Sequence, residues 1–238
     1  MPVVILVGVV AIGILAHIAP FRFVLDKSTV WRMPQAGVEK TIYLTFDDGP
    51  NPTATPKLLD LLKEKNVRAT FFLIDDYVTG ETAPIVRRIF AEGHSVGQHT
   101  GQRWLLLRSP SYIDTMLTAA ADKVERLAGR RPCKLFRPHA GWRSVPMMRG
   151  ASRSGYKIIG WSWMSWDWVG FRERTGPRVA KQLVKHAKPG NIVVIHDGHH
   201  SNPQANRLYA IDATRRVIDE LGAQGYVFGA LCSATQAQ

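Results

Sequence analysis

The chain has 238 residues, of which 45% are hydrophobic, and it carries a formal net charge of +12 with an isoelectric point near 10.0. This length suits one domain of roughly 200 residues with a short appendage, and the apolar fraction excludes a chain that is disordered by composition. The positive charge favours acidic neighbours such as phospholipid head groups or anionic cell-wall polymers. No helix-turn-helix, zinc-finger or aromatic–basic pattern accompanies the charge, so we expect no nucleic-acid partner.

The first stretch of the chain is uniformly apolar. Residues 2–21 contain no formally charged side chain, and about 20 such residues suffice to cross the hydrocarbon core of a bilayer. A cleaved signal peptide is the alternative, but the sequence shows neither its basic n-region nor a clear small-residue cleavage site. We therefore predict an uncleaved, single-pass membrane anchor. Because Arg22, Lys27 and Arg32 follow it, the positive-inside rule places the rest of the chain in the cytoplasm.

Residues 22–39 are predicted to form a linker, and residues 40–238 a single domain in which strand and helix patterns alternate. The predicted strands are rich in β-branched and aromatic residues and cover Thr41–Phe46, Ala69–Ile74, His94–Gln98, Leu135–Phe136, Lys157–Trp161, Ile192–His196 and Tyr226–Ala230. The predicted helices carry apolar stripes and cover 55–62, 82–93, 111–127, 177–186 and 210–221. About seven such repeats predict an α/β fold, a parallel sheet closed into a distorted (β/α) barrel. The two cysteines, Cys133 and Cys232, lack metal-ligand spacing; they can pair, but we expect two buried free thiols.

Acidic, basic and histidine side chains follow the predicted strands where each strand ends. They are Asp47 and Asp48, His99, Arg137 with His139, Asp167, and His196. Each has an ordinary structural explanation: Asp-Asp-Gly is common turn chemistry, and a lone arginine or histidine can be a structural residue. Because the carboxyl ends of parallel strands meet at one rim, however, these side chains are expected to converge. Their coincidence favours a catalytic site.

The same segments carry a family resemblance. In order along the chain they are Thr45–Pro50, Gly93–Thr100, Phe136–Gly141, Asp167–Trp168 and Ile195–Asp197, with framework matches at Ala69–Phe72 and Gly225–Tyr226. This series resembles the polysaccharide deacetylases with a NodB-homology domain, a carbohydrate esterase type, over about residues 40–231. The resemblance implies a distorted (β/α) barrel that removes acetyl groups from N-acetylated sugars with a divalent metal, usually zinc.

The resemblance also implies roles for individual residues. Asp47 would be the general base that deprotonates a metal-bound water, oriented by Arg137, and His196 would protonate the departing amine, tuned by Asp167. The backbone N–H of Ala140 would stabilise the oxyanion. Amide cleavage needs a base, an acid and an oxyanion donor, because water must be activated, the developing negative charge stabilised and a poor leaving group protonated.

Asp48 and His99 would hold the metal, but the third ligand of the family is changed. The family pattern His-Thr-x-x-His reads here His99-Thr100-Gly101-Gln102-Arg103, and a guanidinium has no free lone pair to ligate a metal. Three outcomes are open: replacement by His139, His199 or His200, pairing of Arg103 with Asp48, or loss of catalysis with retention of sugar binding. The first Asp of the family's fourth motif is also changed, to Met164.

The leading hypothesis is a membrane-anchored hydrolase that removes N-acetyl groups from N-acetylhexosamine polymers. One alternative is a metal-free pseudoenzyme that binds envelope glycan; another is a deformylase or deacetylase of a lipid-linked sugar at the cytoplasmic leaflet. Trp142, Trp168 and His139 are the expected substrate contacts, because aromatic faces suit a pyranose ring, although such residues more often pack a barrel. Family resemblance favours an extracytoplasmic domain, against the charge distribution.

Overall fold

The structure is a computed structural model that describes residues 28–35, 38–102, 104–165, 167 and 175–236. The predicted anchor at 1–21 and the linker up to residue 27 lie outside the described residues. A search of the described helices finds none with the length and apolar character that a bilayer span requires.

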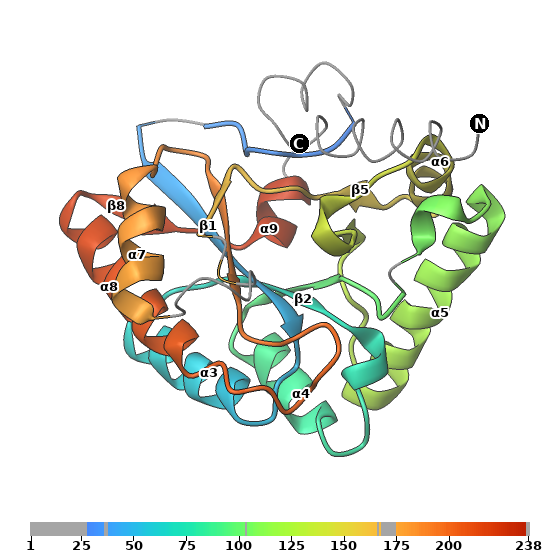
Figure 1. Cartoon of the computed structure of the whole chain (residues 1–238), viewed down its shortest axis with the longest axis horizontal. Helices are drawn as coiled ribbons and strands as arrows, with labels where there is room; N and C mark the ends of the chain where they lie inside the picture. The colour runs from blue at the N-terminus through green and yellow to red at the C-terminus, as the bar shows by residue number, and fades with distance from the viewer. Residues whose placement is uncertain (1–27, 36–37, 103, 166, 168–174, 237–238) are drawn as a thin grey trace, which may run out of the picture.

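The strands form one parallel sheet that curls around the centre of the molecule (Figure 1). Seven strands run in the order β5-β4-β3-β2-β1-β7-β6, and β8 pairs with the first residues of β1 off this path. The strands are β1 (Lys40–Gly49), β2 (Thr70–Leu73), β3 (Ser95–Gln98), β4 (Leu135–Phe136), β5 (Lys157–Ile158), β6 (Trp163–Met164), β7 (Ile192–His196) and β8 (Tyr226–Phe228). The predicted distorted (β/α) barrel is confirmed, and the two-residue β6 is the strand that the sequence did not indicate.

The segment before β1 crosses the gap between the two edges of the sheet. The amide of Val30 donates to the carbonyl of Ile158 at 2.9 Å, and the amide of Gly160 donates back to Val30 at 2.9 Å. On the other side, the amide of Met33 donates to the carbonyl of Gly190 at 2.9 Å. A side chain at Gly160 would come within 2.2 Å of the Trp31 ring, so this close approach requires glycine. The lead-in segment thus takes the place of a further strand.

Helices surround the sheet, and neighbours along the outside follow the order α7, α8, α3, α4, α5 and α6 (Figure 1). They are α3 (Ala54–Glu64), α4 (Ala83–Ala91), α5 (Pro110–Ala128), α6 (Val145–Arg153), α7 (Gly176–Lys185), α8 (Tyr209–Ala223) and α9 (Leu231–Gln236). Five of them match the predicted helices. Helices α6 and α9 were not predicted. Helix α6 was missed because its sequence, VPMMRGASR, combines proline, glycine and serine, although Ser144 caps it by accepting from the amide of Met147 at 3.2 Å.

Strand β1 is the hub of the fold. It pairs with β2, β7 and β8, and every residue from Ile42 to its end is buried. The leucine stripe of α3 packs on this part of the sheet, with Leu58, Leu59 and Leu62 fully buried. The register sets Asp47 opposite His196 of β7. The central strand therefore delivers the two acidic residues from the core to the rim.

The two cysteines form a disulfide, so the expectation of free thiols is wrong. Cys133 precedes β4 and Cys232 lies in α9, and their Cα atoms are 6.0 Å apart across 99 residues of sequence. The amide of Cys133 donates to Val96 and that of Cys232 to Ser95 Oγ, so β3 holds both residues in place. The sequence could not show the disulfide, because the two cysteines meet only when α9 packs against β3.

Candidate active site

Asp47 and Arg137 form a buried ion pair at the carboxyl ends of β1 and β4. Arg137 Nη1 donates to Asp47 Oδ1 at 2.6 Å and to Thr45 Oγ1 at 2.8 Å. The remaining donors of this fully buried guanidinium reach the carbonyls of Ile159 (3.3 Å) and Gly160 (2.9 Å). Its plane also lies 4.0 Å from the centre of the Phe72 ring. The arginine therefore has one orientation, and it fixes the carboxylate of Asp47 at the rim.

His196 lies beside this pair at the end of β7 and is held by Asp167. His196 Nδ1 contacts Asp167 Oδ1 at 2.8 Å, and the His196 amide donates to Asp167 Oδ2 at 2.9 Å. Tyr209 Oη donates to the same carboxylate at 3.0 Å, and Arg207 Nη1 donates to Tyr209 Oη at 3.1 Å. This chain of contacts directs Nε2 of His196 away from Asp167 and fixes the ring.

The charges around His196 favour its protonated form. Burial alone would lower its pKa, but Asp167, assisted by Asp48 and Asp47, outweighs burial and raises the pKa to about 9. Asp167 shows the matching effect: burial opposes ionisation, yet His196 and Tyr209 hold its pKa below the ordinary value. At neutral pH His196 is therefore protonated, and the Asp167 carboxylate is its counter-ion.

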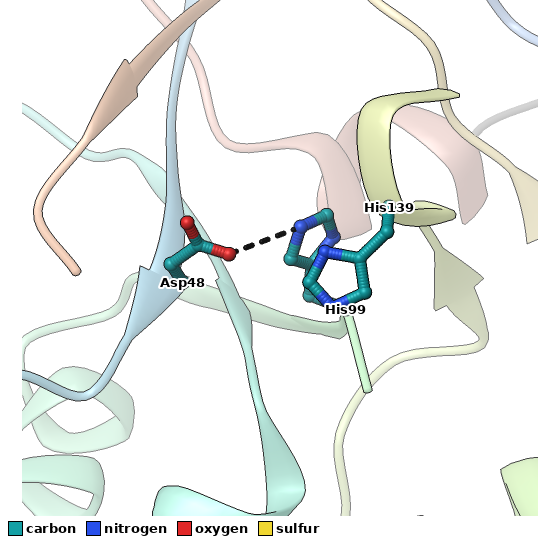
Figure 2. A group of neighbouring side chains, drawn as sticks. All are labelled: Asp48, His99 and His139. Carbon is teal, nitrogen blue, oxygen red and sulfur yellow. Dashed lines mark ion pairs between the residues drawn. The ribbon is translucent and has the colours of Figure 1, made fainter. Parts of the chain in front are cut away.

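A second group at the same rim consists of Asp48, His99 and His139 (Figure 2). One potential ligand atom from each residue lies within 4.8 Å of the others, and Asp48 Oδ1 is 3.3 Å from His99 Nε2. The rings of His99 and His139 have centres 4.3 Å apart. The three residues come from three different strand ends: Asp48 from β1, His99 after β3, and His139 from the 3₁₀ turn η3 (His139–Gly141) after β4.

The hydrogen bonds of this group suit a divalent cation. His99 Nδ1 donates to the Arg137 carbonyl at 2.7 Å, which leaves the lone pair of Nε2 facing Asp48. His139 Nε2 is buried without a hydrogen-bond partner, and Asp48 Oδ1 contacts His99 Nε2 at 3.3 Å. Burial would raise the pKa of Asp48, but His99, His196 and His139 hold it well below its usual range. Burial and the nearby His99 lower the pKa of His139 to about 3, so its ring is neutral.

Three segments at the rim contain a non-glycine residue with positive φ. These are Asp48 (φ 69°) at the end of β1, and Thr100 (φ 58°) and Ala140 (φ 50°) after β3 and β4. This conformation is disfavoured for residues with a Cβ and often marks functional sites. The strain therefore accumulates where the candidate side chains are presented. Close by, a side chain at Gly198 would come within 1.9 Å of the Asp48 carbonyl, so the loop after β7 packs directly on this turn.

These described residues include most of the predicted site. Asp47, Asp48, His99, Arg137, Asp167 and His196 converge at one rim, and His139 joins Asp48 and His99 rather than standing apart from them. Ala140 lies in η3 beside His139, and Trp142 directly follows η3 with its side chain 43% exposed. Arg103 and Trp168 lie outside the described residues, so their predicted positions stay predictions. Met164 is buried in β6.

Comparison with known proteins decides the family. The family profile described as polysaccharide deacetylase matches residues 35–159. The chain belongs to the polysaccharide deacetylase family. It is 33% identical to a peptidoglycan-N-acetylglucosamine deacetylase of Bacillus cereus over 201 residues, which cover 83% of this chain and 88% of the relative. It is 34% identical to a chitooligosaccharide deacetylase of Bradyrhizobium sp., covering 74% of this chain and 78% of the relative.

Among solved structures, a peptidoglycan N-acetylglucosamine deacetylase bound to a naphthalenyl N-oxidanyl-benzamide superposes with a TM-score of 0.77. It is 29% identical and covers 91% of this chain and 97% of that chain. Deacetylases of the polysaccharide deacetylase family are hydrolases that use a divalent metal, and the Asp48, His99 and His139 group could bind one here.

Three residues at this polysaccharide deacetylase site were missed from the sequence. Tyr209 and Arg207 support Asp167 from the start of α8, and no pattern in the sequence indicates them because they act through tertiary contact. Asp197 directly follows His196, is fully buried and accepts a hydrogen bond from Thr55 Oγ1. Burial raises the pKa of Asp197 to about 7. In the sequence, Asp197 ends the Ile195–Asp197 motif, but no role was predicted for it.

Proposed function

We propose that this chain is a hydrolase that removes N-acetyl groups from N-acetylhexosamine residues of a glycan polymer. The observation that carries the proposal is the register of β1 against β7, which sets Asp47 opposite His196. One is a carboxylate paired with Arg137, and the other is a histidine whose charge Asp167 favours. A base and an acid on neighbouring strands are what the cleavage of an amide by water requires.

Asp47 acts as the general base. Its carboxylate accepts a proton from the water that attacks the acetamide carbonyl carbon, while Arg137 holds it in position through Nη1. Arg137 does not exchange protons, since its guanidinium stays charged. The C–O bond forms as the C=O double bond opens, and negative charge develops on the carbonyl oxygen. The backbone N–H of Ala140, in the turn after Arg137, is the proposed donor to that oxygen.

His196 acts as the general acid. Its Nδ1 is engaged by Asp167, so Nε2 is the atom that donates a proton to the sugar nitrogen as the C–N bond breaks. The products are acetate and a free amine on the sugar. Asp167 remains ionised throughout because its second oxygen accepts from the His196 amide and from Tyr209. Asp167 is thus a positioning residue for His196.

The proposed cation is zinc, held at Asp48 and His99 on the same rim, with His139 as the neighbouring donor. When bound, it supplies Lewis-acid polarisation of the carbonyl and of the attacking water. Two imidazoles and one carboxylate form a donor set that catalytic zinc sites commonly use. The buried His139 Nε2, which has no hydrogen-bond partner, and the adjacent Asp48 carboxylate support this assignment, because buried polar atoms are costly unless a partner satisfies them.

We also propose that the domain lies outside the cytoplasm, anchored by residues 1–21, and that Trp142 and Trp168 contact the substrate. The Cys133–Cys232 disulfide supports this location, since structural disulfides persist in oxidising compartments. Relatives that act on peptidoglycan also support it. A C-terminal topology reporter tests the location: a signal from a reporter that is active only in the cytoplasm would favour the orientation that the positive-inside rule predicts.

Acetate release from N-acetylglucosamine oligomers and from peptidoglycan tests the activity. We expect the wild-type chain to release acetate in the presence of Zn²⁺, and Asp47→Asn to reduce the rate by about 10²–10⁴ because the base is lost. Asp219→Asn is the matched control, since Asp219 is an exposed acid that pairs with Lys65 on the surface. Wild-type rates in Asp47→Asn, or no release by the wild type on either substrate, would contradict the proposal; zinc binding without turnover would instead favour a glycan-binding pseudoenzyme.

A further inference from the structure

The geometry points to His139 as the third ligand of the metal site, in place of a second histidine from the turn after β3. The inference rests on the proposed function, because it concerns the cation that this function requires. In the sequence, the position that supplies that second histidine in the family is Arg103, which cannot ligate. The structure offers a different donor, from the turn after β4, that lies within 4.8 Å of the ligand atoms of Asp48 and His99.

The distances suit one shared ion. Donors around a tetrahedral zinc with bonds of about 2.0–2.1 Å are about 3.4 Å apart. Asp48 Oδ1 and His99 Nε2 are separated by 3.3 Å, which already matches that spacing. The ligand atom of His139 lies within 4.8 Å of those of Asp48 and His99, near enough to be a third donor to the same ion. Figure 2 shows both rings on the same side of the Asp48 carboxylate, with His139 carried by η3.

The hydrogen bonding of His139 gives an independent reason. Its Nε2 is buried and has no partner, which is costly for a polar atom unless a ligand satisfies it. The neighbouring Asp48 Oδ1 is buried as well, and its contact is with His99 Nε2 of the same group. A single cation at the centre of the group would satisfy the buried donor atoms together. If His139 served substrate binding alone, the cation would have only two protein ligands in this group, Asp48 and His99.

This arrangement distributes the ligands over three segments, the end of β1 and the turns after β3 and β4. Each of those segments contains a residue at positive φ, namely Asp48, Thr100 and Ala140. A cation bound by all three segments would fix the η3 turn, which also presents Ala140, the proposed oxyanion donor. Metal binding and oxyanion stabilisation would then depend on the same short segment.

Zinc affinity of the purified full-length chain tests the inference without any measurement of turnover. Zn²⁺ is titrated in competition with a chromophoric chelator, and metal content is measured by mass spectrometry. We expect about one equivalent in the wild type, and a fall in affinity of at least about 100-fold in both His139→Ala and His139→Gln, because loss of a direct ligand should exceed the 10–100-fold cost of losing an outer-shell partner. The glutamine variant keeps a polar side chain of similar reach, and far-UV circular dichroism of the metal-free variants shows that folding is retained.

His200→Ala is the matched control, because the His200 ring is 6.5 Å from that of His139 but outside the group. We expect His200→Ala to lose less than about 10-fold in affinity, below the loss expected for an outer-shell partner. With Co²⁺ in place of Zn²⁺, the visible spectrum should change in the His139 variants and not in the control. Wild-type affinity in folded His139→Gln, or an equal loss in His200→Ala, would overturn the assignment. Acetate release with unchanged affinity in the His139 variants would refute this inference and leave the proposed function standing.

Discussion

At the scale of single residues, the site depends on buried charges that are each held by several partners. Arg137 is fully buried and donates to one carboxylate, one hydroxyl and two carbonyls. Asp167 is fully buried and accepts from His196 twice and from Tyr209. Buried charges are tolerated only when they are paired and hydrogen-bonded in this way. The pairs therefore fix orientation, which is what proton transfer at a defined atom requires.

The pH dependence of the reaction follows from the Asp167–His196 pair. His196 must carry a proton to act as the acid; with its pKa raised to about 9, activity should fall as the pH rises through that value. In Asp167→Asn the counter-charge is lost, so the pKa of His196 falls. We expect the alkaline limb of the kcat profile to move to lower pH by about 1–3 pH units.

Tyr209→Phe is the control for that experiment. It removes a hydrogen bond at 3.0 Å to the Asp167 carboxylate but keeps the charge, so the alkaline limb should move by much less. The measurement is the initial rate of acetate release across the pH range, at saturating substrate. An unchanged alkaline limb in Asp167→Asn would show that His196 does not act as the acid.

At the scale of elements, the sequence predicted what depends on local pattern. Five helices, seven strands and the placement of Asp47, Arg137 and His196 at strand ends follow from periodicity and from parallel topology. What it could not predict depends on contacts between distant segments. The disulfide forms only because α9 packs against β3. Asp167 is supported by Tyr209 of α8. The position of His139 next to His99 depends on the conformation of η3 after β4.

The contact between α5 and α6 gives an element-scale prediction. A Cβ at Gly150 of α6 would lie 2.5 Å from the Pro110 carbonyl and 2.6 Å from Ile113 Cβ, both in α5. Helix propensity favours alanine over glycine by about 1 kcal/mol, but overpacking costs about 1–3 kcal/mol. We expect Gly150→Ala to lower the free energy of unfolding in urea. The steric cost should exceed the gain in helix propensity, because the Pro110 backbone and the branched Ile113 side chain cannot move away easily.

Gly222→Ala in α8 is the matched control, since nothing lies within 4 Å of an added Cβ there. It should raise the free energy of unfolding by about 0.5–1 kcal/mol through propensity alone. If Gly150→Ala lowers the free energy of unfolding and Gly222→Ala raises it, the effect at Gly150 comes from the close contact of α5 and α6. Stabilisation in both would mean that α6 can move away from α5 without cost.

At the scale of the whole molecule, the carboxyl and amino ends of the parallel strands have different roles, one in the site and the other in stability. The carboxyl ends of β1, β4 and β7 carry Asp47, Arg137 and His196. The amino ends are tied down by α9, where Leu231 donates to Thr70 Oγ1 at 2.9 Å and Cys232 is joined to Cys133. Because the parallel strands separate the two ends, a change at the amino end should alter stability with little effect on the chemistry.

The disulfide tests that separation. Cys133 and Cys232 are 99 residues apart, and closing so long a loop restricts the unfolded chain strongly. We expect the Cys133→Ser, Cys232→Ser double variant to lose about 2–5 kcal/mol of unfolding free energy. Its Tm should fall by on the order of 10 °C, while kcat measured well below the transition stays within about twofold of the wild type. A reducing agent should bring the Tm of the wild type down to that of the variant and leave the variant unchanged. A large fall in kcat of the folded variant would show that the two ends of the sheet are coupled, because loss of a distant cross-link would then have moved the site.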